Sequence, residues 1–306
     1  MEYLCSDCPR RCGAKRSATE RGGFCASPAA ARVARASPHF GEEPCISGTR
    51  GAGTIFFTGC NLRCVYCQNR EISRGGGAGR PVSRDELRKM MLRLRDEGVH
   101  CIDLVTPTHF LRAVREALEG LELGIPVVWN SSGYESVEAL RTLEGLVQVY
   151  MPDYKYSDAA LAKKYSAAAD YPEAAAAAIR EMYRQTGPYR LDGDGLLVSG
   201  VLIRHLILPG EIENSMGAID FVSESFPKGS VLFSLMSQYT PMPGLEKFPA
   251  LCRRVDAAEN EHLIRYMRRC GVTDGYWQDT ASATDEMIPA FDGTGVEPQL
   301  EETVFP

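Results

Sequence analysis

Residues 53–73 read GTIFFTGCNLRCVYCQNREIS and contain three cysteines at C-x3-C-x2-C spacing. A strand-like apolar run, residues 54–58, leads directly into the loop that holds Cys60, Cys64 and Cys67. A structural zinc site uses four protein ligands and a disulfide uses two, so three thiols match neither pattern. The stretch therefore predicts a strand followed by a loop whose metal site lacks one protein ligand.

The composition is that of a globular protein with no general affinity for nucleic acid or membranes. The chain has 306 residues, 44% of them hydrophobic, and 34 basic against 40 acidic residues give a net charge of −6. That balance argues against a general nucleic-acid or membrane-surface binder. No secretory signal follows Met1 and no apolar run is long enough to span a membrane, so we expect a cytoplasmic protein. In a reducing compartment its eleven cysteines are candidate metal ligands or catalytic thiols.

Positive charge is concentrated at the start of the chain. The first 40 residues carry seven Lys or Arg residues against three acids. Two interpretations stay open: a solvated face around a metal site, or a docking patch for an acidic redox partner.

Apolar runs alternate with helix signals after residue 53. The runs are residues 54–58, 101–106, 125–129, 146–151, 201–208 and 230–236. Ser83 and Glu86 predict a capping box, and the Ala-rich residues 159–185 predict two helices that meet at Pro172. Such alternation builds a parallel sheet, so we expect an α/β fold, a partial (β/α)6 TIM-like barrel with its chemistry at the strands' C-terminal ends. An open doubly wound sheet is the alternative; no G-x-G-x-x-G follows the first strand to favour it.

The sequence divides into three expected parts. Residues 1–50 read as a Cys-rich metal-binding N-terminal segment, residues 51–282 as the barrel, and residues 283–306 as an acidic C-terminal strap.

The three-cysteine loop follows the first strand, where a βα barrel places its active site. Three thiolates can hold three irons of a [4Fe–4S] cluster and leave the fourth iron open for another ligand. Soft thiolates favour iron–sulfur or zinc over harder ions. The competing interpretation is a zinc site completed by a distant Cys or His.

The segment GCNLRCVYCQN resembles the signature loop of the radical S-adenosylmethionine (SAM) superfamily. The resemblance implies a [4Fe–4S] cluster on Cys60, Cys64 and Cys67, SAM on the open iron, and reductive cleavage to a 5′-deoxyadenosyl radical that abstracts hydrogen. Tyr66, within the loop, joins the expected cofactor-binding residues. Further blocks resemble uncharacterised relatives of pyruvate formate-lyase activating enzymes, from Cys5 to about Val296: HFGEEPCISGTRGAGTIFFTGCNLRCVYCQN, DLVTPTHF, PVVWNSSGYE, MPDYKY, LIRHLILPG and FDGTGV.

That resemblance implies further SAM contacts. Asp153 and Lys155 match an Asp-x-Lys motif of the activating enzymes, and His205 matches a histidine that contacts the SAM ribose there. Alternation along a regular strand would turn Arg204 to the face opposite His205.

The sequence also departs from the family pattern. Thr106 and Thr108 stand where the superfamily has Gly-Gly-Glu, and Asn130 stands where the activating enzymes have an Asp, followed closely by Ser132. These polar residues are predicted SAM or substrate contacts, although the missing carboxylates put a cation-assisted SAM site in doubt.

A second cysteine set precedes the barrel. Cys5, Cys8, Cys12 and Cys25 supply four ligands, enough for zinc or a second [4Fe–4S] cluster. A second cluster would relay electrons, whereas zinc would attach residues 1–50 to the barrel.

Together these features predict a radical SAM oxidoreductase that takes hydrogen from a protein or small-molecule substrate. By resemblance, its partners would be a flavodoxin- or ferredoxin-type electron donor and a glycyl-radical enzyme as substrate. The alternative is a non-catalytic iron–sulfur and SAM-binding scaffold or redox sensor.

Overall fold

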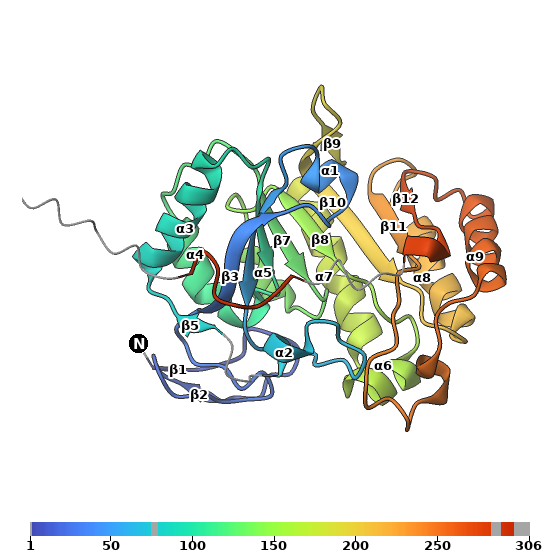
Figure 1. The fold of residues 1–306 in the computed structure, drawn as a ribbon, viewed down its shortest axis with the longest axis horizontal. Helices are drawn as coiled ribbons and strands as arrows, with labels where there is room; N and C mark the ends of the chain where they lie inside the picture. Colours follow the sequence, from blue (N-terminus) through green and yellow to red (C-terminus); the bar gives the residue numbers. More distant parts are fainter. Residues whose placement is uncertain (1, 75–78, 283–288, 297–306) are drawn as a thin grey trace, which may run out of the picture.

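The computed structural model describes residues 2–74, 79–282 and 289–296, and its centre is a twisted, mostly parallel sheet (Figure 1). Seven parallel strands follow one another in chain order across it, without a reversal. They are β4 (Ala52–Phe57), β6 (Ile102–Val105), β7 (Val127–Ser131), β8 (Val149–Pro152), β10 (Leu197–Leu206), β11 (Leu232–Met236) and β12 (Gly275–Trp277). A doubly wound sheet reverses its order at a switch point, so this winding is that of a partial barrel and the α/β prediction is confirmed.

Shorter and antiparallel strands extend the sheet. β3 (Arg32–His39) runs antiparallel to β4, β5 (Arg80–Pro81) pairs with β3, and β9 (Arg190–Leu191) pairs with β10. β1 (Tyr3–Leu4) and β2 (Lys15–Arg16) form a separate two-stranded sheet. The main sheet thus begins within the first 50 residues, which sequence patterning had assigned to a metal-binding segment.

Helices cover the outer face of the sheet (Figure 1). The helices of the described residues are α1 (Pro44–Ser47), α2 (Arg70–Ser73), α3 (Arg84–Asp96), α4 (Leu111–Leu118), α5 (Val137–Arg141), α6 (Ala159–Ser166), α7 (Tyr171–Thr186), α8 (Ile212–Ser225) and α9 (Ala257–Arg269), with 3-10 turns η1 (Thr108–Phe110), η2 (Pro249–Cys252) and η3 (Thr280–Ser282); of these, α1 packs against the inner apolar layer described next. The capping box between Ser83 and Glu86 forms as predicted. The Ala-rich region forms two helices, and Pro172 lies in the first turn of the second, where its missing N–H costs least.

Alternation along the strands separates two environments. Outward-facing side chains such as Ile55, Leu104 and Ile203 belong to the large core beneath the helices. Inward-facing Val128, Met151 and Leu202 form a smaller apolar layer that also includes Cys45 and Cys101. Further along the same strands, polar side chains replace this apolar layer on the inner face, and they form the floor of the cavity described below.

The described part of the C-terminal region lies beside β3. The backbone N–H of Ala36 donates to Thr294 (2.9 Å), and that of Gly293 donates to Ala34 (3.1 Å). Of the predicted acidic strap, residues 283–288 and 297–306 lie outside the described residues. Within the described ranges, no helix is both long and apolar enough to cross a membrane.

Candidate active site

A cavity of about 510 Å³ opens at the C-terminal ends of the parallel strands. Its size is within the range of small-molecule sites. It is lined by all three loop cysteines, Cys60, Cys64 and Cys67, and by polar side chains of four strand ends: Thr106, Asn130, Ser132, Asp153, Lys155 and Arg204. The structure therefore brings the two halves of the sequence prediction, the loop and the strand-end residues, to one place.

The cysteine loop is buried and tightly held. The N–H of Leu62 donates to Cys60 Sγ (3.3 Å), and the Ser166 hydroxyl donates to Cys64 Sγ (3.0 Å). Arg63, between the first two cysteines, has a φ of 57°, a left-handed conformation that non-glycine residues seldom adopt. Such local strain is common at functional sites.

The donor set fits an iron–sulfur cluster with an open position. Burial raises the pKa of Cys60 to about 12, and burial raises the pKa of Cys67 as well. These thiols therefore carry protons until a metal displaces them, which couples cluster binding to proton release. Among the described residues, no three His, Cys, Asp or Glu side chains are grouped as around a single metal ion.

Arg204 organises the floor of the cavity. Its guanidinium donates to Asp153 Oδ1 (3.0 Å), to Glu42 Oε2 (2.8 Å) and to Asn130 Oδ1 (2.8 Å). Lys155 Nζ contacts the other Asp153 oxygen at 2.5 Å. One cation thereby joins β7, β8 and β10 to the segment that precedes α1.

The carboxyl groups around Arg204 differ in their ease of ionisation. Burial alone would raise the pKa of Asp153, but Lys155 and Arg204 outweigh it and hold that pKa below its usual value. Burial raises the pKa of Glu42 and of Glu43 despite the attraction of Arg204. Burial and the neighbouring Glu42 charge raise the pKa of Asp103 well above its ordinary value. Of these four carboxyl groups, Asp153 is therefore the one whose ionised form its surroundings favour.

Several predicted residues are available to a ligand in the cavity. Thr106 has a φ of 59° at the end of β6, and Ser132 Oγ is buried without a hydrogen-bond partner. Tyr66 also lines the cavity, with only 5% of its surface exposed. Asn130 lies between Arg204 and Asp103: its side-chain oxygen accepts from Arg204, and its side-chain NH2 group donates to Asp103 (3.3 Å).

Two predicted cofactor contacts are corrected by the structure. His205 is fully buried on the outer face of β10, where its ring bonds to the Tyr154 carbonyl (2.6 Å) and the Ser215 hydroxyl (2.9 Å). Thr108 lies in η1 and donates to Glu135 Oε1 (3.0 Å), away from the cavity. Both side chains are satisfied within the protein.

The sequence prediction missed the acidic partners of Arg204. Glu42 and Glu43 lie next to each other in the block HFGEEPC, and both line the cavity. Two adjacent carboxylates immediately before a buried helix would have been an available signal. The alternation argument correctly separated Arg204 from His205, but which of them faces inward depends on the phase of the strand.

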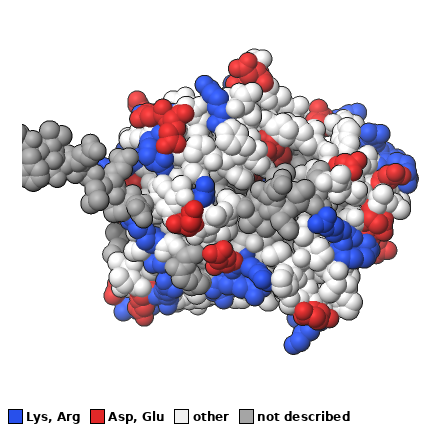
Figure 2. Space-filling view, viewed as in Figure 1, with Lys and Arg blue, Asp and Glu red and all other residues white. Residues whose placement is uncertain are grey.

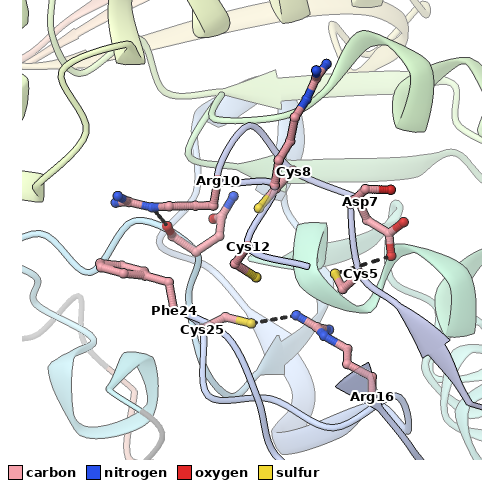
Figure 3. A pocket seen from close by; sticks show the side chains of 11 residues that line it. Cys5, Asp7, Cys8, Arg10, Cys12, Arg16, Phe24 and Cys25 are labelled. Carbon is pink, nitrogen blue, oxygen red and sulfur yellow. Dashed lines mark hydrogen bonds between the residues drawn. The ribbon is translucent and has the colours of Figure 1, made fainter. Parts of the chain in front are cut away.

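The N-terminal cysteines line a different and much smaller pocket, of about 10 Å³. Cys5, Cys8, Cys12 and Cys25 turn their side chains toward one another there (Figure 3). The structure thus brings together the second predicted set, apart from the large cavity.

Comparison with known proteins identifies the family. A sequence model described as the Radical SAM superfamily matches residues 54–221, a range that begins in β4 and ends in α8. The chain belongs to the radical SAM superfamily. Membership implies a [4Fe–4S] cluster and SAM, the pair for which the loop thiols and the cavity offer a site.

Comparison with individual proteins finds a sequence relative and two solved structures of similar fold. The radical SAM chain is 30% identical over 271 residues to "Uncharacterized protein MJ0674" of Methanocaldococcus jannaschii, covering 85% of this chain and 73% of that protein. Streptococcus suis SuiB bound to precursor peptide SuiA has the same fold, with a TM-score of 0.51, 13% identity, and coverage of 75% of this chain and 49% of SuiB. SuiB bound to S-adenosylmethionine gives a TM-score of 0.51, 12% identity, and coverage of 76% and 52%. The chain spans about half the length of SuiB.

Proposed function

We propose that the protein cleaves SAM reductively and uses the product to abstract hydrogen from a substrate. The observation that carries this proposal is that three buried thiols and the Asp153–Lys155 pair line one cavity. When bound, a [4Fe–4S] cluster supplies the electron that splits SAM into methionine and a 5′-deoxyadenosyl radical. Cys60, Cys64 and Cys67 would hold that cluster, and a flavodoxin- or ferredoxin-type protein would reduce it.

The chain's own residues would bind and orient SAM. SAM carries a carboxylate, an ammonium and a sulfonium, so a site for it needs both signs of charge. Lys155 offers a cation for the carboxylate, and Asp153, whose pKa is held below its usual value by Lys155 and Arg204, attracts the cationic groups. Ser132 Oγ and Thr106, at neighbouring strand ends, are free to accept or donate hydrogen bonds to the same ligand. The buried walls exclude water and so strengthen these interactions.

We further propose an activase-like substrate, a glycine Cα–H in a partner polypeptide. The support is the similarity of the blocks around Asp153 and the cysteine loop to activating enzymes. The cavity is also lined by Trp277 of β12, a residue that is 46% exposed, and so reaches the protein surface.

The experiment is an anaerobic assay of reduced, cluster-reconstituted protein with SAM, with 5′-deoxyadenosine measured by chromatography. The wild-type protein is expected to form 5′-deoxyadenosine, and Cys60→Ala is expected to fall to the background of a protein-free control. Cys252→Ser, which changes an exposed cysteine outside both sets, is the matched control. Identical traces from wild type and Cys60→Ala would instead support the scaffold or sensor alternative.

A further inference from the structure

The four N-terminal cysteines lie in a short segment whose loops are closed by backbone hydrogen bonds. Cys5 follows β1 and its N–H donates to the Ala14 carbonyl (2.9 Å), which closes the loop that carries Cys8 and Cys12. Cys25 lies in the next turn, where Gly22 and Ser27 pair as an isolated bridge. Figure 3 shows the four sulfur-bearing side chains around one space.

The backbone around these cysteines adopts left-handed conformations at two non-glycine residues. Arg11, directly before Cys12, has a φ of 40°, and Ala26, directly after Cys25, has a φ of 50°. A Cβ on Gly23 would lie 2.7 Å from Cys12 Sγ, so glycine leaves room for that sulfur. Each such left-handed non-glycine residue costs on the order of 1–3 kcal/mol, which the surrounding contacts must offset.

A buried cation faces the cysteines. Arg16 is only 2% exposed, and its guanidinium donates to Cys25 Sγ (2.7 Å) and to the His109 carbonyl (2.6 Å). The acid that lines this pocket, Asp7, is paired with Arg112 (3.0 Å). A buried guanidinium without a carboxylate of its own requires another negative charge, and thiolates around a metal supply one.

The cysteine pocket touches the loop of the large cavity. Asn61, which follows Cys60, lines the pocket, and Arg10 Nε donates to its carbonyl (3.0 Å). The Asn61 amide donates in turn to the Tyr134 carbonyl (2.6 Å). A group that orders the N-terminal segment would therefore also order the segment next to Cys60.

We propose that Cys5, Cys8, Cys12 and Cys25 bind a second metal centre through four thiolates, with Arg16 as its buried counter-charge. The ligand chemistry is that of a soft metal: Zn²⁺ or a [4Fe–4S] cluster, each with four sulfur ligands and no open position. Among the described residues, these thiols are not as close together as ligands of a single ion, so zinc binding would require the four sulfur atoms to move closer to one another. This proposal stands without the proposed function, because none of its ligands belongs to the large cavity.

The first test removes the other cysteine set. The full-length Cys60→Ala/Cys64→Ala/Cys67→Ala variant is purified anaerobically, offered iron with sulfide or Zn²⁺ in separate samples, and washed with EDTA. We expect retention of either about four iron and four sulfide or about one zinc per chain, and the two arms identify the metal. Retention of neither overturns the proposal.

Cysteine variants assign the metal to this pocket. In the same background, Cys12→Ser is expected to lose the retained metal, whereas Cys252→Ser keeps it; both cysteines are exposed. Circular dichroism on both variants shows that the fold is kept. Full retention of metal by folded Cys12→Ser and Cys25→Ser variants would refute the assignment.

Arg16 variants test the counter-charge. Arg16→Gln is expected to release metal to a competing chelator about 10–100-fold more readily, as substitutions beside metal ligands do, while Arg16→Lys recovers part of the affinity. A purely structural arginine would lower thermal stability in both variants and leave chelator competition unchanged, and that result would contradict its assigned role.

Discussion

The molecule contains two cysteine sites of opposite design. The loop set, Cys60, Cys64 and Cys67, faces a cavity of about 510 Å³, whereas the N-terminal set of four faces a space of about 10 Å³. Each set has a buried arginine nearby: Arg204 pairs with carboxylates beside the loop set, and Arg16 contacts a cysteine of the N-terminal set. A metal site with three protein ligands and room for a substrate is suited to catalysis. A site with four protein ligands and no such room is suited to a structural role or to electron storage.

Basic residues of the N-terminal segment make contacts with the barrel. On the face in Figure 2, basic and acidic side chains are interspersed around the rim rather than gathered into one patch. Arg10 and Arg16 instead donate to barrel carbonyls of Asn61, Ser166 and His109. Part of the basic segment therefore attaches the N-terminal site to the barrel, which neither interpretation from the sequence had included.

The largest expected effect separates the two sites by activity. Cys67→Ala should reduce 5′-deoxyadenosine formation at least about 100-fold, since removing one cluster ligand removes the electron that the reaction needs. Cys8→Ala should leave a measurable rate with a lowered cluster content. Initial rates per iron, measured anaerobically, check this.

Equal loss of activity in Cys67→Ala and Cys8→Ala would break the distinction between an open and a closed site.

Substitutions of Arg204 and Arg16 should lower the stability of the protein in different ways: only the effect at Arg16 should depend on bound metal. Arg204→Met removes the cation beside Glu42 and Glu43 and leaves Asp153 with Lys155 alone, so it should destabilise the fold by about 3–5 kcal/mol, with or without metal. For Arg16→Met we expect a loss that is larger in metal-loaded protein than in metal-free protein. Urea unfolding of both variants, each with and without metal, measures the difference.

The same metal dependence for both variants would show that Arg16 is an ordinary buried cation.

A buried histidine near each site should make the protein sensitive to mild acid. The carbonyl of His109 accepts a hydrogen bond from Arg16, and His205 follows Arg204 on β10. Burial lowers the pKa of each histidine ring to about 4. The unfolded rings titrate near 6.5, so the unfolded state binds more protons between those values and stability falls as pH drops from 6.5 to 4. The loss should reach roughly 3 kcal/mol per ring over the whole window.

Urea unfolding at intervals from pH 7 to 4.5 tests this. His205→Gln should show a shallower pH slope than wild type, and an unchanged slope would mean that His205 does not contribute.

The smallest effect concerns backbone strain at the open site. Thr106 has a φ of 59°, which glycine adopts at little cost. Thr106→Gly should therefore change the free energy of unfolding by only about 1 kcal/mol. Glycine relieves the backbone strain in the folded state, but it also makes the unfolded chain more flexible, and the two effects oppose each other. A raised KM for SAM in the same variant would show that the Thr106 hydroxyl binds the ligand.

If stability falls by several kcal/mol, the hydroxyl is part of the fold rather than of the site.

The elements with strong local patterns could be predicted, and those fixed by distant partners could not. Six strands, the capping box at Ser83 and the cysteine loop follow from short-range periodicity and spacing. β3 was missed because its sequence, RVARASPH, mixes arginines and a proline into a strand whose partners, β4, β5 and residues 293–294, lie elsewhere in the chain. His205 was misassigned because a strand's alternation fixes which residues share a face but not which face is inside.

The unclosed sheet has a consequence for how a substrate enters. Within the described residues the strand order ends at β5 beside β3 on one side and at β12 on the other, yet His39 of β3 and Trp277 of β12 line the same cavity. A closed barrel admits a molecule only through its mouth, so a polymer would have to present a free end or a narrow loop. Here the cavity is bordered by two sheet edges, so the strands of the described part of the chain do not by themselves confine entry to the mouth.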